Sequence, residues 1–151
     1  MKISNNPVET LVAFAIGAGI GLSIYDPEAD MGGILNFIRP YCMGSETGKA
    51  RQFPYMYADT GIPAFLAALE NRGAHNKNLK IVVAGGASSI DPTGGYNIGR
   101  KNFQAVKEIL AQNNLVITHE DIGGLHRRTL SLEIGSGAGT INVFGRAEKK
   151  I

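Results

Sequence analysis

Seven short apolar runs, separated by turns rich in glycine, proline and aspartate, constrain the fold of this chain more than any other feature. Each run is four to seven residues long, which is typical of buried strands and short for a helix. Gly accounts for 20 of the 151 residues, in keeping with many tight turns. The first three runs follow one another closely and suggest an antiparallel meander. The predicted strands are Thr10–Ile16, Gly19–Tyr25, Gly32–Ile38, Leu79–Ala84, Leu115–Thr118, Thr129–Ile134 and Thr140–Phe144.

Two stretches instead carry apolar residues at helical spacing, Asp59–Arg72 and Ile98–Gln112. We expect Asp59 or Thr60 to cap the first helix and Asn97 to cap the second. Strands and helices do not alternate regularly, which excludes a simple βαβ fold and favours an α+β domain. The sequence therefore predicts a single domain over residues 1–151, largely antiparallel or mixed in its sheets, with residues 1–9 loosely attached.

Charge and cysteine usage exclude several classes of function. The net charge of +2 is too small to indicate nucleic acid as a partner. The apolar run Leu11–Leu22 is too short to span a bilayer and contains three glycines, so we expect no membrane insertion. Cys42 is the only cysteine in the chain, so no intrachain disulfide can form. We therefore expect a cytoplasmic protein.

Three candidate sites can be weighed from residue types alone. The glycines at Gly17, Gly19 and Gly21 lack the G-x-G-x-x-G spacing and a following helix, so we expect no nucleotide cofactor. His119 and His126 bracket Glu120-Asp121 but lack the ligand spacing of known metal sites, so we expect no metal. His75 lies in a predicted loop. Cys42 has no base nearby in the sequence, and we interpret it as a structural thiol.

Four blocks of sequence, in this order, resemble the chemotaxis receptor deamidase family, CheD. They are the segment from Leu11 to Pro40, the YADT motif that begins at Tyr57 with the helix after it, the segment from Ile81 to Asn102 with its A-G-G-A turn and N-I-G-x-x-N motif, and E-D-x-G-G at Glu120–Gly124. The resemblance implies a β-sandwich-like core flanked by helices. It also implies a cytoplasmic chemotaxis protein whose partners are chemoreceptor segments and a CheC-type phosphatase.

The family hydrolyses receptor glutamine side chains with a cysteine nucleophile and a histidine base, and this chain departs from both. Anchoring the resemblance on Asp26-Pro27 puts the family cysteine at Gly19 and a family threonine at Ala13, and the family histidine falls at Asn36. Glycine has no side chain to attack an amide, and asparagine cannot accept a proton near neutral pH. Shifting the alignment restores neither group, because Leu11–Leu22 contains no cysteine and no histidine precedes His75.

Two functions from different classes follow from this resemblance. The first is a non-catalytic CheD-like module that binds its partners through Asn36, Gly17 and Gly19. The second is an active protein-glutamine deamidase or other amidohydrolase with relocated machinery, in which Cys42 is the nucleophile and His119 or His126 the base. We favour the first, because three matching positions have lost their chemistry together.

Overall fold

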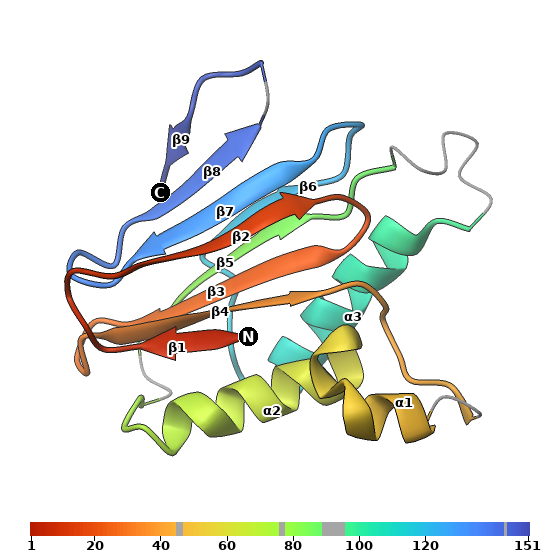
Figure 1. The fold of residues 1–151 in the computed structure, drawn as a ribbon, viewed down its shortest axis with the longest axis horizontal. Helices are drawn as coiled ribbons and strands as arrows, with labels where there is room; N and C mark the ends of the chain where they lie inside the picture. The colour runs from red at the N-terminus through yellow and green to blue at the C-terminus, as the bar shows by residue number, and fades with distance from the viewer. Residues whose placement is uncertain (45–46, 76–77, 89–95, 144) are drawn as a thin grey trace.

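Two β-sheets stacked face to face form the body of the protein, with helices on the outer face of the larger sheet (Figure 1). The computed structural model describes residues 1–44, 47–75, 78–88, 96–143 and 145–151. This arrangement confirms the predicted α+β class and the sandwich-like core.

The larger sheet has five strands in the order β1-β4-β3-β5-β6. All neighbours are antiparallel except β5 and β6, which run parallel. Its central strand, β3, is buried along its whole length because the sheet is covered on both faces. The strands are β1 (Lys2–Ser4), β3 (Ile20–Asp26), β4 (Met31–Phe37), β5 (Lys80–Gly85) and β6 (His119–Ile122).

The smaller sheet is antiparallel and has the order β2-β7-β8-β9. Its strands are β2 (Thr10–Ile16), β7 (Arg128–Glu133), β8 (Gly139–Val143) and β9 (Lys149–Lys150). The expected meander of the first two or three strands holds only for the antiparallel pair β3 and β4, because β2 pairs with β7 in the other sheet. Inward residues of β2 such as Leu11 and Ile16 pack between the sheets, and the chain crosses from one sheet to the other at the glycines that follow.

The helical segments that cover or flank the larger sheet in the described part of the chain include α1 (Thr47–Gln52), the 3₁₀ turn η2 (Pro54–Met56), α2 (Ala58–Glu70) and α3 (Ile98–Gln112). The caps predicted for the first helix are wrong, because the N-cap residue of α2 is Tyr57. Asn97 is the N-cap residue of α3, as predicted, but its backbone is left-handed with φ of 49° and its side chain makes no cap hydrogen bond. Among the described residues, no helix is long and apolar enough to cross a membrane.

The apolar core has two parts that meet across the larger sheet. One part joins α2 and α3 to one face of the sheet through residues such as Phe65, Val106 and Leu22. The other fills the space between the two sheets, with Leu130 and Ala84 among its members. Burial on both sides explains why β3 is mostly apolar and why even its polar residues Ser23 and Asp26 are buried.

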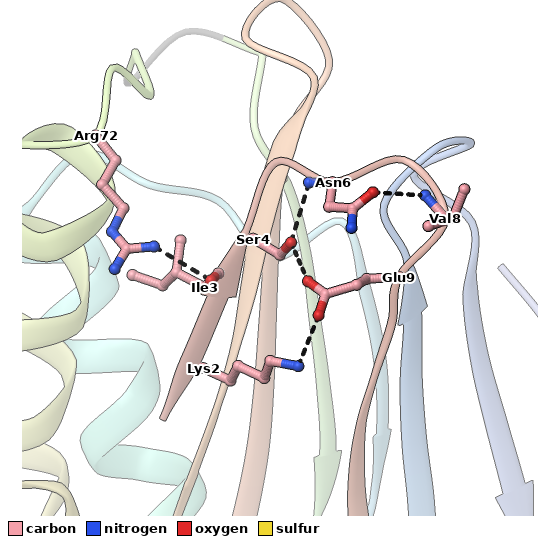
Figure 2. A network of polar contacts seen from close by, with 7 residues as sticks. All are labelled: Lys2, Ile3, Ser4, Asn6, Val8, Glu9 and Arg72. Carbon is pink, nitrogen blue, oxygen red and sulfur yellow. Dashed lines mark hydrogen bonds and ion pairs between the residues drawn. The ribbon is translucent and has the colours of Figure 1, made fainter.

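The N-terminal residues are held in place, in contrast to their expected loose attachment (Figure 2). Strand β1 pairs with Gly32–Ile34 of β4. The hydroxyl of Ser4 donates to the carboxylate of Glu9, and Lys2 Nζ lies 3.0 Å from the same carboxylate. Arg72 of the segment after α2 donates to the carbonyl of Ile3 over 3.2 Å. Polar side chains therefore anchor a strand too short to be recognised from its apolar pattern.

The Glu9 network should make the attachment of β1 depend on pH. Hydrogen bonds from Ser4 and then Lys2 hold the pKa of Glu9 below its ordinary value of 4.5. The contribution of the network is therefore complete above that ordinary value and is lost as pH falls through the lowered pKa. We expect the NMR signals of the β1 amides to stay constant above about pH 4.5 and to shift and broaden as the pH falls below that value. A Glu9→Gln variant should show no such transition, and equal transitions in both proteins would contradict this prediction.

Candidate functional site

The largest described hollow lies where the loop between β2 and β3 meets the turn after β5 and the start of α3. Its volume is about 660 Å³. Arg127 is the only charged side chain among the described residues that line it, and these include no cysteine, histidine or carboxylate. The lining residues are Ala15, Gly17, Ala18, Gly19, Ile38, Ala87, Ser88, Tyr96, Asn97, Ile98, Gly99 and Arg127. We call this hollow the glycine cavity.

Close backbone packing builds the floor of the glycine cavity. The N–H of Gly86 donates to the carbonyl of Gly19 over 2.8 Å, and the N–H of Ala87 donates to Gly17 over 2.9 Å. A Cβ on Gly85 would lie 2.4 Å from the Gly19 oxygen, and Gly85 has φ of 129°. Glycine is therefore required at Gly85, which explains the A-G-G-A turn in physical terms.

Gly19, the position that the resemblance assigns to the nucleophile, has no room for a side chain. A Cβ built on its backbone would lie 2.5 Å from the carbonyl oxygen of Phe37 and 3.4 Å from Ile38 Cγ2. The first contact is with backbone, which cannot move aside as a flexible side chain can. A side chain at residue 19 would therefore require the backbone at Phe37 to shift.

The other two positions named by the resemblance lie beside the glycine cavity. Asn36 is exposed on β4 and pairs with Gly21 of β3. Asn36 and Ala13 line a separate hollow of about 300 Å³, so the structure brings these two residues together. Gly17 and Gly19 line the glycine cavity, and Asn36 does not. Ile38 lines the glycine cavity and also a groove of about 370 Å³ that includes Asn36, so the hollows adjoin.

Asn102 of α3 holds this region together, and sequence reasoning did not find its role. Its side chain is fully buried, and its amide nitrogen donates to the carbonyls of Ala18 over 2.8 Å and Ile38 over 3.1 Å. One side chain thus joins α3, the loop before β3 and the end of β4. The available signal was a polar residue within the buried stripe of a helix, where an unpaired amide would be costly.

Replacing Asn102 with leucine should loosen the glycine cavity. The change leaves the carbonyls of Ala18 and Ile38 without their donor, which costs about 2 kcal/mol in the free energy of unfolding. We expect faster hydrogen exchange at the amides of Gly86 and Ala87, and unchanged exchange at Thr118, which bonds to Ile81 elsewhere in the sheet. Asn113→Leu, at the exposed C-terminal end of α3, is the matched control. Equal exchange at Gly86 in both variants would exclude this role for Asn102.

Cys42 lies outside the glycine cavity, in the segment after β4. Its backbone N–H donates to the carboxylate of Asp59 over 2.9 Å, which ties this segment to the start of α2. The neighbouring Tyr41 donates its hydroxyl proton to Glu108 over 2.7 Å. That bond raises the pKa of Tyr41 and lowers the pKa of Glu108. The segment is thus fastened to both large helices.

The predicted alternative base and metal-ligand residues do not line the glycine cavity either. His119 lies on β6, opposite Val82 of β5, and His126 is exposed before β7. Asp121 accepts two hydrogen bonds from the buried guanidinium of Arg128, at 2.9 and 2.7 Å, which commits this carboxylate to an ion pair. In the described part of the chain, no three histidine, cysteine, aspartate or glutamate side chains gather as a metal site would require.

Comparison with known proteins agrees with the resemblance noted in the sequence. The family model described as "CheD chemotactic sensory transduction" matches residues 43–143. The chain is 40% identical over 136 residues to a probable chemoreceptor glutamine deamidase CheD of Solibacter usitatus, covering 90% of this chain and 80% of that protein. A protein of the same description from Syntrophus aciditrophicus is also 40% identical, with 90% and 84% covered.

A third such protein, from Symbiobacterium thermophilum, is 34% identical over 155 residues, which covers all of this chain and 92% of the relative. The family-model match begins at Met43 and therefore lies after Gly19 and Asn36, whereas the pairwise matches extend over most of the chain. These matches show that the chain belongs to the CheD family of chemotaxis proteins.

Proposed function

We propose that this CheD-family protein is a non-catalytic binding module for chemoreceptor cytoplasmic segments or for a CheC-type phosphatase. The related proteins described as chemoreceptor glutamine deamidases supply the class of partner. In this chain the nucleophile, base and threonine positions of the resemblance hold Gly19, Asn36 and Ala13. The Asn36 side chain can form hydrogen bonds with a glutamine amide, but none of the three residues can attack it.

One geometric observation supports the loss of catalysis more strongly than the residue types do. The Phe37 carbonyl oxygen lies 2.5 Å from where a Cβ on Gly19 would be. A protein that had merely exchanged its nucleophile would keep the space for a larger side chain. Here the backbone of β4 occupies that space, so the site has adapted to glycine.

The glycine cavity remains suitable for binding. Its volume of about 660 Å³ lies within the usual range for ligand pockets, and it is lined mainly by small and apolar residues. Gly17 and Gly19 allow a partner to approach the backbone closely. Asn36, on the groove that shares Ile38 with this cavity, can donate and accept hydrogen bonds. We propose that a receptor side chain enters this cavity.

Titration of the protein into a labelled cytoplasmic chemoreceptor fragment tests binding directly. Gly17→Phe should fill the cavity without backbone strain, because the nearest atom to a Cβ at Gly17 is Arg127 Cγ at 3.9 Å. We expect this variant to bind about tenfold more weakly, equivalent to about 1.4 kcal/mol. Gly44→Phe is the matched control, since a Cβ there meets nothing within 4 Å and Gly44 does not line the cavity. Absence of binding by the unmodified protein, with a CheC-type partner also negative, would contradict the proposal.

A further inference from the structure

Arg127 brings a positive charge without a partner to the glycine cavity. It is the only charged side chain among the described residues that line the cavity, and it makes no ion pair or hydrogen bond with any of them. Its neighbour Arg128 differs, because the buried guanidinium of Arg128 already pairs with Asp121 at 2.7 Å. The stem of Arg127 lies near Gly17, where a Cβ would be 3.9 Å from Arg127 Cγ. The described structure therefore places an unpaired guanidinium at the cavity wall.

The first turn of α3 adds to the positive charge at the cavity. Asn97 and Ile98, where this helix begins, belong to the lining. The turn contains no acidic residue, and Arg100 and Lys101 are exposed within it. The N-terminal end of a helix carries a partial positive charge of its own. An anionic group in the cavity is therefore favoured first by Arg127 and second by the start of α3.

The hydrogen-bond donors of Arg127 distinguish a carboxylate from an amide. A guanidinium has only N–H donors and no acceptor, and a carboxylate can accept two parallel bonds from it. A glutamine amide offers one oxygen, and its NH₂ group would meet N–H groups with which it cannot bond. The apolar lining residues Ala15, Ala18 and Ala87 suit the methylene stem that glutamate and glutamine share, so they do not discriminate. Selectivity for glutamate over glutamine therefore depends on Arg127.

We propose that the glycine cavity binds a glutamate side chain of the chemoreceptor in preference to a glutamine, with Arg127 as the residue that determines this specificity. The proposal rests on the receptor-binding function above and names the form of the receptor that binds. Hydrolysis of a glutamine side chain consumes water, releases ammonia and leaves glutamate. The reaction that supplies this ligand is thus the one for which the related deamidases are named. This chain would then bind the product of its active relatives and distinguish deamidated receptors from unmodified ones.

Titration with one receptor fragment in two forms tests this preference. One form keeps glutamine at the sites that an active CheD protein deamidates, and the other carries glutamate there. We expect the unmodified protein to bind the glutamate form about tenfold more tightly, because hydrogen bonds to a charged group within a cavity contribute more than an ion pair on open surface. Raising the ionic strength from about 0.05 M to about 0.5 M should reduce the preference, since salt screens the charges.

Variants of Arg127 separate the carboxylate contact from binding in general. Arg127→Gln should bind both forms equally, with the affinity that the unmodified protein has for the glutamine form. Arg127→Lys keeps the charge and should retain part of the preference. Arg146→Gln is the matched control, because Arg146 is exposed and does not line the cavity, and this variant should keep the full preference. Urea denaturation of each variant checks that it is folded.

NMR on the unmodified protein decides the matter if the Arg127 variants fail to fold. The Nε–H signal of Arg127 should move further downfield with the glutamate form than with the glutamine form, because a carboxylate is the stronger acceptor. Equal binding of the two forms, or a preference that persists in Arg127→Gln, overturns glutamate recognition. The proposed function then still stands if Gly17→Phe weakens that binding. If neither form binds the unmodified protein, glutamate recognition is overturned together with receptor binding.

Discussion

Replacing Gly99 with alanine should destabilise the protein by about 3 kcal/mol, although glycine to alanine within a helix normally stabilises by up to about 1 kcal/mol. Gly99 is the second residue of α3 and lines the glycine cavity. A Cβ at this position would lie 2.2 Å from the carbonyl oxygen of Gly86 and 2.6 Å from its carbonyl carbon. Both contacts are with backbone, so α3 and the turn after β5 must separate to accommodate one methyl group.

Urea denaturation of Gly99→Ala and of Gly48→Ala tests this close contact. Gly48 also lies in a helix, α1, but a Cβ there meets nothing within 4 Å. The Gly48 variant should therefore be neutral or slightly more stable, as helix propensity predicts. If Gly99→Ala proved as stable as Gly48→Ala, the contact between α3 and the A-G-G-A turn would be looser than described here.

Restoring the family's reactive groups should not restore deamidation. The triple variant Ala13→Thr, Gly19→Cys, Asn36→His supplies a nucleophile, a base and a hydroxyl at the three positions of the resemblance. The new Cβ at residue 19 nevertheless meets the Phe37 carbonyl oxygen at 2.5 Å. Either the β3–β4 pairing shifts or the thiol points away from the histidine, and misplacement of about 1 Å costs about a hundredfold in rate.

The measurement is the rate at which the triple variant deamidates a receptor fragment. We expect no turnover above background for the triple variant, together with a loss of about 1–3 kcal/mol of stability from overpacking. Ala13→Thr with Asn36→His alone is the matched control. Because Ala13 is buried between the sheets, this control carries its own cost, and the stability lost through residue 19 is the difference between the two variants. Turnover by the triple variant comparable with that of an active CheD protein would show that the backbone around Gly19 still accepts a nucleophile.

The sequence predicted most strands and both long helices because their apolar patterns have local causes. The predicted range Ile98–Gln112 coincides with α3, and Thr10–Ile16 coincides with β2. The strand predicted over Leu115–Thr118 was wrong. The observed strand, β6, begins directly after this segment and spans His119–Ile122. Leu115 instead lies just after the C-terminal end of α3, where its N–H donates to the Leu110 carbonyl. Its side chain packs in the core between the helices and the larger sheet. The polar residues of β6 form a strand because β5 offers a parallel edge.

The local apolar pattern did not predict elements whose formation depends on tertiary contacts. Strand β1 is only three residues long, and its stability comes from pairing with β4 and from the Glu9 network. The predicted strand Thr140–Phe144 ends at Val143 in β8, and Phe144 lies outside the described residues. The chain passes from the smaller sheet to the larger sheet after β2, and only the glycines at this point hint at it in the sequence. The strand that pairs with β2, β7, lies more than a hundred residues away.

The candidate site was partly accessible from sequence. Gly19, Asn36 and Ala13 could be named only through the family resemblance, since none carries chemistry of its own. The blocked Cβ at Gly19 depends on the position of the Phe37 carbonyl, and the unpaired charge of Arg127 depends on its place at the wall of the glycine cavity. Neither can be read from residue types. Both arise from how segments far apart in the sequence lie against one another in space.

Mass spectrometry of a chemoreceptor fragment incubated with the unmodified protein tests the central claim most directly. Conversion of a glutamine side chain to glutamate adds about one dalton, and an active CheD protein serves as the positive control. We predict no such gain, because the residue at the nucleophile position is Gly19 and the base position holds Asn36. A gain of about one dalton that depends on this protein, and that Cys42→Ser abolishes, would contradict the account and establish an enzyme with relocated machinery.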